Sequence, residues 1–305
     1  MEDFRRMAIF AAVVQRGTMS AAARQLDMTP SAVSQHIRQL EKEAGINLLH
    51  RSTRQLSLTD AGQRFYVQCA AMCEAADRAS AELAAERQQP SGELRLSAPA
   101  GFTQHAVPAL GDWLRQHPGL RLRLLMDDKP IDLIEARVDL ALRFGHLPDS
   151  SWIARPLGRS PTVLCAAPQL LAQLSELPQH PRDLMDLPWL DMNRSEPPQI
   201  NALWQHSPSG ESFQLQVTPQ MSSNHRAAVQ QFCEAGLGLA LLSAHDVTAS
   251  LRQGRLLRLL PQWDMGQLDI WAVTAQREAL SAKVRQAIEV LRQYFAGLEG
   301  MQQSL

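Results

Sequence analysis

One segment of the sequence carries a row of polar side chains that could contact nucleic acid. If residues 29–44 form a helix, one face presents Ser31, Gln35, Arg38 and Lys42, with Ser34 and Gln39 on its flanks. Glutamine can pair with adenine through two hydrogen bonds, serine can donate or accept, and arginine or lysine can neutralise a phosphate. This face therefore has the chemistry needed to read base edges and to bind the backbone of duplex DNA.

The residues around this face predict a helix-turn-helix. Thr29 can cap the helix, and Pro30 occupies its first position, where a missing N–H costs nothing. An apolar stripe faces the other way, formed by Val33, Ile37, Leu40 and Ala44. Ahead of it, Ser20 can cap a short helix that residues 27–28 interrupt before the second helix begins.

Any amphipathic helix has a polar face, even when it binds nothing. The neighbouring segments therefore decide whether this face reads DNA or is simply exposed to solvent. Residues 3–15 predict a third helix that completes a small core with Phe4, Met7, Ala8, Ala11 and Val14. Residues 48–51 and 55–58 predict two short strands around 52–54. This hairpin would be a wing, with Arg51 and Arg54 placed to reach the DNA backbone or the minor groove.

In this region the sequence resembles the LysR-type transcriptional regulators. The resemblance rests on Phe10, Gly17, Ser20, Ala21, Ala22, Ala23, Leu26, Thr29, Ser31, Ala32, Val33, Ser34, Ile37, Leu40, Glu41, Leu48, Leu49, Arg51, Leu58, Thr59, Ala61 and Gly62. It implies a winged helix that binds a gapped, imperfectly palindromic DNA site as a dimer. Pro30 and Gln35 stand where many members have glutamine and arginine, so the base preference does not carry over.

The expected DNA-binding residues combine the polar face, the helix starts and the wing. They are Ser20, Thr29, Pro30, Ser31, Ser34, Gln35, Arg38, Lys42, Arg51 and Arg54. Charge alone supports this weakly, because residues 1–60 hold eight basic and six acidic residues in a chain of net charge −1.

Composition indicates an ordinary globular protein with more than one domain. The chain has 305 residues, of which 45% are hydrophobic and 20% charged. It has no apolar run of membrane-spanning length and no apolar signal region, so we expect a cytoplasmic protein with no membrane partner. Its four cysteines form no C-x-x-C pair and its nine histidines show no metal-ligand spacing. We therefore expect free thiols, no metal and no cofactor.

Residues 59–87 predict one long helix, about 40 Å at 1.5 Å per residue. Apolar residues alternate spacings of four and three along it: Phe65, Cys69, Met72, Ala76, Ala79 and Leu83. The helix could pack on its own domain. We favour a dimerisation seam, because the DNA-binding domain, residues 1–58, is already complete and a two-fold site needs two readers at a fixed separation.

After a hinge at 88–92, alternating strands and helices predict an α/β effector domain over 93–305. Strands are expected at 93–97, 120–126, 138–143, 162–166, 189–192, 214–217, 239–242 and 268–275, and helices at 105–116, 130–137, 169–174, 226–235 and 281–296. The fold class is thus α/β with an all-α-plus-wing N-terminal domain. Lobe I would comprise about 93–161 and 268–300, and lobe II about 162–267.

This second region is similar to the two-lobed, periplasmic-binding-protein-like effector domain of the same family. The similarity is carried by Gly92, residues 94–96, 138–143, 236–240 and 254–257, and Ser243 stands where the family commonly has proline. Residues 145–155 further resemble a subgroup that includes regulators of aromatic carboxylic acid efflux. The resemblance implies an effector bound between the lobes, assembly as a homodimer or homotetramer, and contact with RNA polymerase.

Ligands of open α/β sheets bind at the carboxyl ends of strands. This rule selects Ala98, Pro99, Gly101, Phe102, Thr103, Asp128, Arg143, Phe144, Gly145, Asn193, Ser223 and Asn224 as the effector site. Arg143 would pair with a carboxylate of the effector, or alternatively with Asp127 or Asp128. Phe102 or Phe144 would stack on a ring, or alternatively pack in the core.

These observations favour a DNA-binding regulator that senses a small, anionic molecule, either an aromatic or another carboxylate. The alternative is a two-lobed small-molecule-binding protein or enzyme with an accessory helical domain, and a third reading is a DNA-architectural protein. The sequence contains no G-x-S-x-G, Walker A or H-E-x-x-H motif, which disfavours an enzyme.

Overall fold

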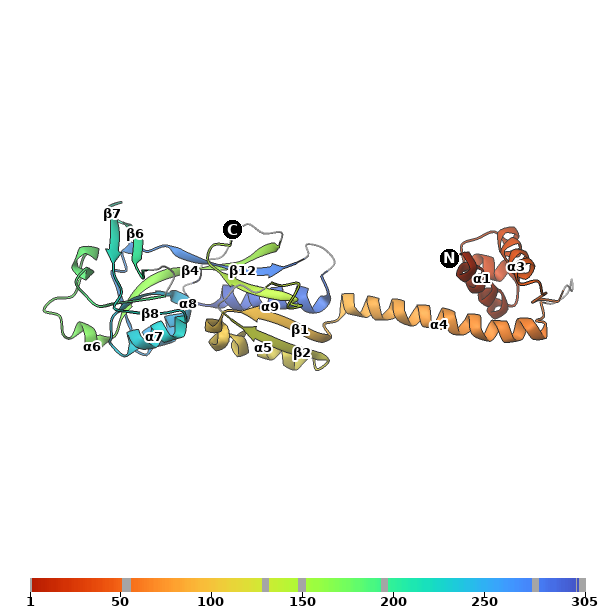
Figure 1. Ribbon diagram of the computed structural model, residues 1–305, viewed down its shortest axis with the longest axis horizontal. Helices are drawn as coiled ribbons and strands as arrows, with labels where there is room; N and C mark the ends of the chain where they lie inside the picture. The colour runs from red at the N-terminus through yellow and green to blue at the C-terminus, as the bar shows by residue number, and fades with distance from the viewer. Residues whose placement is uncertain are drawn as a thin grey trace. The chain divides into compact units, whose positions relative to one another are not determined.

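The computed structural model describes residues 2–50, 56–127, 132–147, 152–192, 197–275, 280–299 and 301. The chain forms two compact units, Met1–Ala85 and Glu86–Leu305 (Figure 1). Across these described ranges, no helix is both long enough and apolar enough to cross a bilayer.

The first unit contains the expected helix-turn-helix. Its helices are α1 (Glu2–Arg16), α2 (Met19–Gln25) and α3 (Pro30–Ala44), followed by the start of α4 (Asp60–Gln88). The Thr29 hydroxyl accepts a hydrogen bond from the N–H of Ala32 at 3.2 Å, so this cap is confirmed. The cap of α2 is Thr18, whose hydroxyl accepts from Ala21 at 3.1 Å, whereas Ser20 lies inside the helix. The expectation that Ser20 caps α2 was therefore wrong.

The core of this unit only partly follows the expected stripe. Ala11 is buried as expected, and Met7 and Val14 pack against the core, but Phe4 is 62% exposed. The other deeply buried side chains of α1 are Ile9, Phe10 and Val13. On α3, Val33, Ile37 and Leu40 are buried as expected, but Ala44 is exposed. The reason is that α1 contacts α2 and α3 and also meets α4, where the ring of Phe10 lies 5.5 Å from that of Phe65. A helix with three neighbours buries a wider arc than one stripe.

Backbone pairing at the base of the expected wing is present in the structure. Leu49 and Leu58 form an antiparallel bridge, and the N–H of His50 donates to the carbonyl of Ser57 at 2.9 Å. Arg51 and Arg54 lie outside the described residues.

Two further contacts join this base to α3 and α4. The Glu41 carboxylate of α3 accepts the N–H groups of Leu48 and Leu49 at 2.8 and 3.0 Å. At Gly62, a Cβ atom would lie 2.0 Å from the Leu48 carbonyl oxygen, so only glycine allows α4 to approach this closely.

The helix α4 has two different parts. Cys69 is buried, and Phe65, Tyr66 and Cys73 also pack against the core of the first unit. Burial raises the pKa of the Cys69 thiol to about 11, so this cysteine is a protonated core residue. Phe65 and Cys69 thus belong to the core of their own unit. Further along the helix Ala76 and Ala79 are exposed, and Leu83 is 70% exposed.

The second unit is built on a sheet with two halves. Along its path the strands are β2 (Leu120–Met126), β1 (Gly92–Ala98), β3 (Leu140–Phe144), β12 (Gln267–Thr274), β4 (Ile153–Ala166), β9 (Leu239–Ser243), β5 (Trp189–Met192) and β8 (Met221–Ser223), with β10 (Leu257–Leu259) paired to β4. The long strand β4 pairs with β12 up to Pro161 and with β9 from Thr162. The strand expected at 162–166 therefore begins nine residues earlier, at Ile153, and joins lobe I to lobe II.

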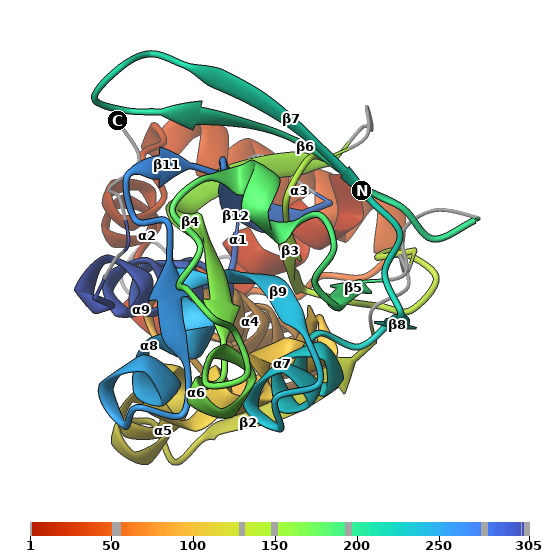
Figure 2. The same cartoon turned by 90° about the vertical axis from the view of Figure 1, so that its left-hand side faces the viewer.

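Helices cover this sheet and form the core of each lobe. In lobe I, α5 (Thr103–Gln116) and α9 (Ala282–Gly297) pack on β1, β3 and β12, and the short η1 (Ala100–Phe102) precedes α5. Lobe II contains α6 (Pro168–Leu171), η2 (Pro181–Leu184), α7 (Arg226–Glu234) and α8 (Ala244–Arg252). Figure 2 shows the hairpin of β6 (Ile200–His206) and β7 (Ser212–Val217), which pairs with β11 (Trp263–Asp264) in a separate sheet.

One expected helix is wrong and several elements were not expected. Within the described part of 130–137, the chain forms only a single turn. The Asp132 carboxylate caps this turn by accepting the N–H groups of Ile134 and Glu135. The turn ends at Arg137, whose left-handed φ of 52° cannot continue a helix. Five elements, β6, β8, β10, β11 and α8, were not predicted from the sequence, and most of them are short or lack a clear apolar period.

Candidate DNA interface and effector site

The polar face of α3 lies at the surface of the first unit. Ser31, Gln35, Arg38 and Lys42 are all exposed, while Ser34 is half-buried. Arg38 folds back along the helix, where its Nη2 donates to the Ser34 hydroxyl at 3.2 Å and its Nε to the Ser34 carbonyl at 3.3 Å. Gln35 and Lys42 therefore project most freely from this face.

The other expected DNA-binding residues have different positions. Ser20 is exposed on α2, and Thr29 and Pro30 are exposed at the first turn of α3, although the Thr29 hydroxyl already serves as the cap. Capping leaves the N-terminal turn of α3 open toward solvent, which is the end that contacts bases in a helix-turn-helix.

The expected effector residues of lobe I lie at the carboxyl ends of neighbouring parallel strands. Ala98 ends β1, and its carbonyl accepts the N–H of Asp127, which follows β2, at 3.0 Å. Pro99 leads into η1, which contains Gly101, and Thr103 begins α5. Phe102 is fully buried with its ring 6.4 Å from that of Phe295, so it packs in the core.

Arg143, at the end of β3, has an incompletely satisfied guanidinium. Its Nη1 donates to the Leu142 carbonyl at 2.9 Å and approaches the Ser97 hydroxyl at 3.4 Å. Its Nη2 is buried and has no hydrogen-bond partner among the described residues. Burial lowers the pKa of this arginine. A buried donor without a partner is costly, so an acceptor arriving here would be stabilised.

The remaining expected residues are structural or outside the described ranges. Gly145, with a φ of 84°, lies in a turn where its N–H donates to the backbone carbonyl of Asp269 and its own carbonyl accepts from the Trp271 indole. The Ser223 hydroxyl accepts the N–H of His225, and Asn224 is exposed. Asp128 and Asn193 lie outside the described residues.

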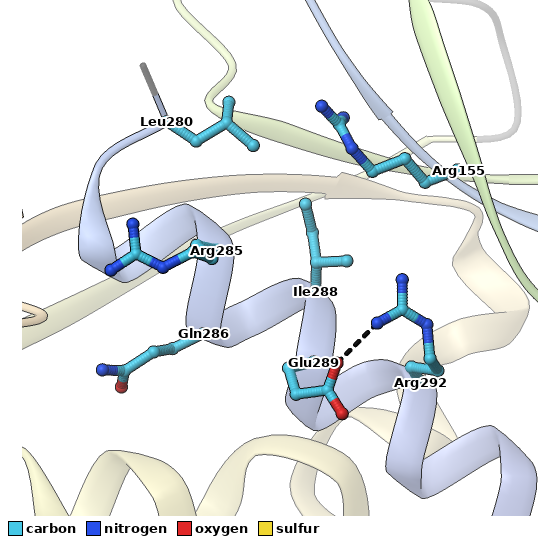
Figure 3. Close-up of a pocket in the computed structure, with 7 residues that line it drawn as sticks. All are labelled: Arg155, Leu280, Arg285, Gln286, Ile288, Glu289 and Arg292. Carbon is cyan, nitrogen blue, oxygen red and sulfur yellow. Dashed lines mark hydrogen bonds and ion pairs between the residues drawn. The ribbon is translucent and has the colours of Figure 1, made fainter. Parts of the chain in front are cut away.

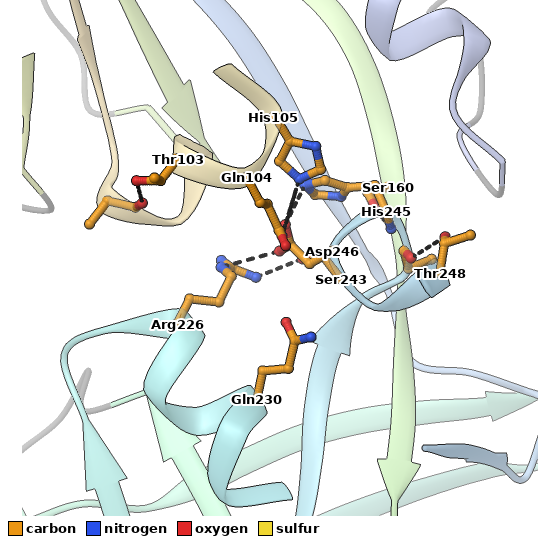
Figure 4. A network of polar contacts seen from close by, with 12 residues as sticks. Thr103, Gln104, His105, Ser160, Arg226, Gln230, Ser243, His245, Asp246 and Thr248 are labelled. Carbon is orange, nitrogen blue, oxygen red and sulfur yellow. Dashed lines mark hydrogen bonds and ion pairs between the residues drawn. The ribbon is translucent and has the colours of Figure 1, made fainter. Parts of the chain in front are cut away.

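A polar cluster between the lobes contains residues that the sequence analysis missed (Figure 4). His105 comes from α5 of lobe I, and His245 and Asp246 come from α8 of lobe II. Oδ1 of Asp246 lies 3.0 Å from Nε2 of His105 and 3.3 Å from Nε2 of His245. Phe144 stacks on His245 with ring centroids 6.0 Å apart. Phe144 therefore contacts the opposite lobe.

Two further side chains complete this cluster. The Gln104 amide Nε2 lies 3.1 Å from Asp246 Oδ1. Arg226, the first residue of α7, has its Nε 3.7 Å from Asp246 Oδ2 and donates from Nη1 to the Ser243 hydroxyl at 2.6 Å. The Arg226 side chain also lies within 3.9 Å of the position that a Cβ on Gly101 would occupy. Arg226 thus approaches the predicted effector residues from lobe II.

Burial and hydrogen bonding set the charges in this cluster. Burial lowers the pKa of His245 to about 4, against the opposing effect of Asp246, so this imidazole is neutral near pH 7. Burial by itself would raise the pKa of Asp246, but the hydrogen bond from His105 and the electrostatic interactions with His245 and Arg226 lower it overall. His245 and Asp246 closely follow the carboxyl end of β9, so their position after the strand at 239–242 is the sequence signal that points to them.

A pocket of about 400 Å³ lies elsewhere in the second unit, beside α9 (Figure 3). It is lined by Arg155, Leu280, Arg285, Gln286, Ile288, Glu289 and Arg292. Its arginines already bond within the chain: Arg292 pairs with Glu289, Arg285 donates to the Arg87 carbonyl, and Arg155 donates to Thr274. This pocket contains none of the expected effector residues.

Comparisons with known proteins identify both units. The model of the bacterial regulatory helix-turn-helix protein, lysR family, matches residues 4–63, and that of the LysR substrate binding domain matches residues 87–296. The HTH-type transcriptional regulator DmlR of Escherichia coli is 36% identical over 94% of this chain and 93% of its own length. The HTH-type transcriptional activator AaeR of the same species is 33% identical over 97% and 94%.

A solved structure gives the same picture. The full-length structure of AphB, a virulence activator of Vibrio cholerae, is similar with a TM-score of 0.70 and 25% identity, covering 95% of this chain and 98% of that chain.

The low pKa of His245 predicts a pH-dependent stability of the second unit. Unfolding returns this imidazole to its ordinary pKa of 6.5, so the unfolded state binds more protons below that pH and stability falls as pH falls from 6.5 to 4. The loss should reach about 3 kcal/mol at pH 4. The free energy of unfolding can be measured against pH by urea unfolding with EDTA present. His245→Gln should lose most of the pH dependence, whereas His146→Ala, a control at an exposed histidine, should keep it. An equal slope in His245→Gln would contradict the prediction.

Proposed function

Since the chain belongs to the LysR family of transcriptional regulators, we propose that it binds a gapped, imperfectly palindromic promoter site as a dimer and responds to a small carboxylate effector. Its relatives are named as transcriptional regulators, so its activity is regulation and not enzymatic catalysis. We further propose that it acts in the cytoplasm and contacts RNA polymerase.

The exposed face of α3 carries the DNA-binding proposal. Gln35 and Lys42 are exposed on the same helix, which Thr29 caps at its free N-terminal end. An amide can pair bidentately with adenine, whereas an ammonium group neutralises phosphate without reading sequence. Glu41 holds the backbone of Leu48 and Leu49, so the base of the wing keeps a fixed position relative to this helix.

The exposed part of α4 supports the dimer. Ala76, Ala79 and Leu83 lie on a seam of three- and four-residue spacing and all face solvent in the single chain. Leu83 is 70% exposed, so packing it against Leu83 of a second chain would remove apolar surface from water and stabilise the dimer. The small side chains of Ala76 and Ala79 would let the two helices approach closely. A homotetramer would follow from pairing of the second units, as the family resemblance implies.

The effector proposal rests on the carboxyl ends of β1, β2 and β3. Within the described part of the chain, Arg143 holds a buried nitrogen without a partner at this edge, and a carboxylate would supply an acceptor. Arg226 offers a second guanidinium from lobe II, close to Gly101. An anion between the lobes would therefore meet positive groups from both of them.

Base reading by α3 can be separated from phosphate binding. Gln35→Ala should cost about 1–3 kcal/mol on the preferred site and relax specificity at one base position. Lys42→Ala should weaken binding to all sequences equally and reduce the salt slope by about one. Binding-site selection and salt titration measure these effects. An unaltered site preference in Gln35→Ala would refute the proposed orientation of α3.

The dimer seam can be tested at Leu83. Leu83→Glu would place two like charges opposite each other across a two-fold axis, where no partner compensates them. Analytical ultracentrifugation should then show dissociation, and tight binding to the full DNA site should be lost. Ala81→Glu, at an exposed position off the seam, serves as the control and should remain dimeric. A stable dimer of Leu83→Glu would show that the chains associate elsewhere.

The effector site can be tested with benzoate and its uncharged analogue benzamide. Isothermal titration should show binding of benzoate but not benzamide, and Arg143→Ala should weaken benzoate binding by about ten- to a hundredfold, which is the worth of one charge-assisted hydrogen bond. Arg159→Ala removes an exposed arginine that pairs with Asp269 and should change nothing. DNA binding without effector should be equal in all three proteins. Equal benzoate affinity in Arg143→Ala would exclude this residue from the site.

A further inference from the structure

We propose that His105, His245 and Asp246 form a site for a divalent transition-metal ion of the zinc type, which joins the two lobes. All three side chains are buried, and they come from α5 of lobe I and α8 of lobe II. The effector proposal does not require this ion, because the contacts of Arg143 are separate from those of the three ligands, and the two sites share only the neighbouring Arg226.

The spacing of the three ligand atoms fits a tetrahedral metal. They all lie within 4.8 Å of one another, and Asp246 Oδ1 lies 3.0 Å from Nε2 of His105 and 3.3 Å from Nε2 of His245. Two ligands about 2.0–2.1 Å from a tetrahedral zinc ion lie about 3.3 Å apart. Small side-chain rotations would therefore bring the three atoms around one ion.

Two neighbouring residues support this assignment. The Tyr294 hydroxyl lies 2.6 Å from Nδ1 of His105, so with Nε2 on the metal, Nδ1–H would donate to Tyr294 Oη. The Gln104 amide lies 3.1 Å from Asp246 Oδ1, and a half-turn of this amide would present its oxygen as a fourth ligand. A water molecule could take that position instead.

The donor set selects the class of metal. Imidazole nitrogen suits zinc, cobalt, nickel and copper, whereas magnesium and calcium prefer oxygen ligands. His245 is neutral near pH 7 and Asp246 is ionised, which are the protonation states that bind a metal. The sequence showed no metal motif, because the ligands are 140 and 141 residues apart and only the fold brings them together.

Arg226 opposes a bound dication and so provides a specific test. Its Nε lies 3.7 Å from Asp246 Oδ2, on the carboxylate oxygen that the histidines do not contact. Replacing it with the uncharged methionine removes a repulsive charge while retaining a long side chain. Arg226→Met should therefore tighten metal binding. If the cluster is only a polar contact between the lobes, neither the natural protein nor Arg226→Met will bind zinc.

The experiment uses the full chain, ZnCl₂ titration by calorimetry and CoCl₂ titration by absorption spectroscopy. We expect one zinc ion per chain, ligand-field bands of tetrahedral cobalt without a thiolate charge-transfer band, and a zinc-dependent rise in the Tm of the second unit. The missing thiolate band would exclude Cys69 and Cys73 as ligands.

Variants separate the cluster from other metal-binding groups. Asp246→Asn and His245→Gln should each weaken zinc binding by more than about a hundredfold, and Tyr294→Phe by about tenfold, since loss of a ligand costs more than loss of its hydrogen-bond partner. His146→Ala, at an exposed histidine, should bind zinc like the natural protein. Circular dichroism checks that each variant is folded. The tighter zinc binding expected of Arg226→Met is a further control, because misfolding cannot increase the affinity for zinc. The proposal is overturned if the natural protein binds no stoichiometric zinc, or if Asp246→Asn and His245→Gln retain its affinity.

Discussion

A buried carboxylate at the junction of the two lobes sets the strongest constraint on the second unit. Asp246 is 8% exposed, so its charge must be satisfied by neighbouring donors. His105, His245 and Gln104 all approach one of its oxygens, and Arg226 approaches the other. These groups come from α5, α7 and α8, so lobe I and lobe II have to meet in one arrangement for the carboxylate to be paired. Removing either lobe's donors would leave a buried charge, which is among the costliest defects in a protein.

The first unit depends on a comparable, smaller constraint. Glu41 accepts two backbone N–H groups at the base of the wing, and Gly62 lets α4 touch the backbone of Leu48. Through these contacts one short segment links α3, the wing and the start of α4. The face of α3 that carries Gln35 and Lys42 is thereby oriented relative to the exposed seam that begins beyond Cys73. A regulator that reads a two-part DNA site needs this geometric relation between its reading helix and its dimerisation element.

Local patterns predicted most of the elements. The strands at 120–126, 189–192 and 239–242 are short segments rich in leucine, and they appear at or within one residue of their expected bounds. The start of α3 follows from Thr29 and Pro30, whose effects act within one turn. Errors arose where a local signal competed with another interaction. The left-handed Arg137 ends, after one turn, a segment that looked helical, and Thr18 caps α2 in place of Ser20.

The sequence by itself determined the family, the helix-turn-helix and the alternation of strands and helices, because these depend on side-chain types at short, regular spacing. Only the tertiary structure decided which apolar residues of α1 and α4 face the core, since Phe10 and Phe65 are neighbours only after the helices pack. It alone placed His105 beside Asp246, which lies 141 residues further along the chain. Contacts of such separation depend on strand order and on the long strand β4 that joins the lobes, and no local pattern records either of them.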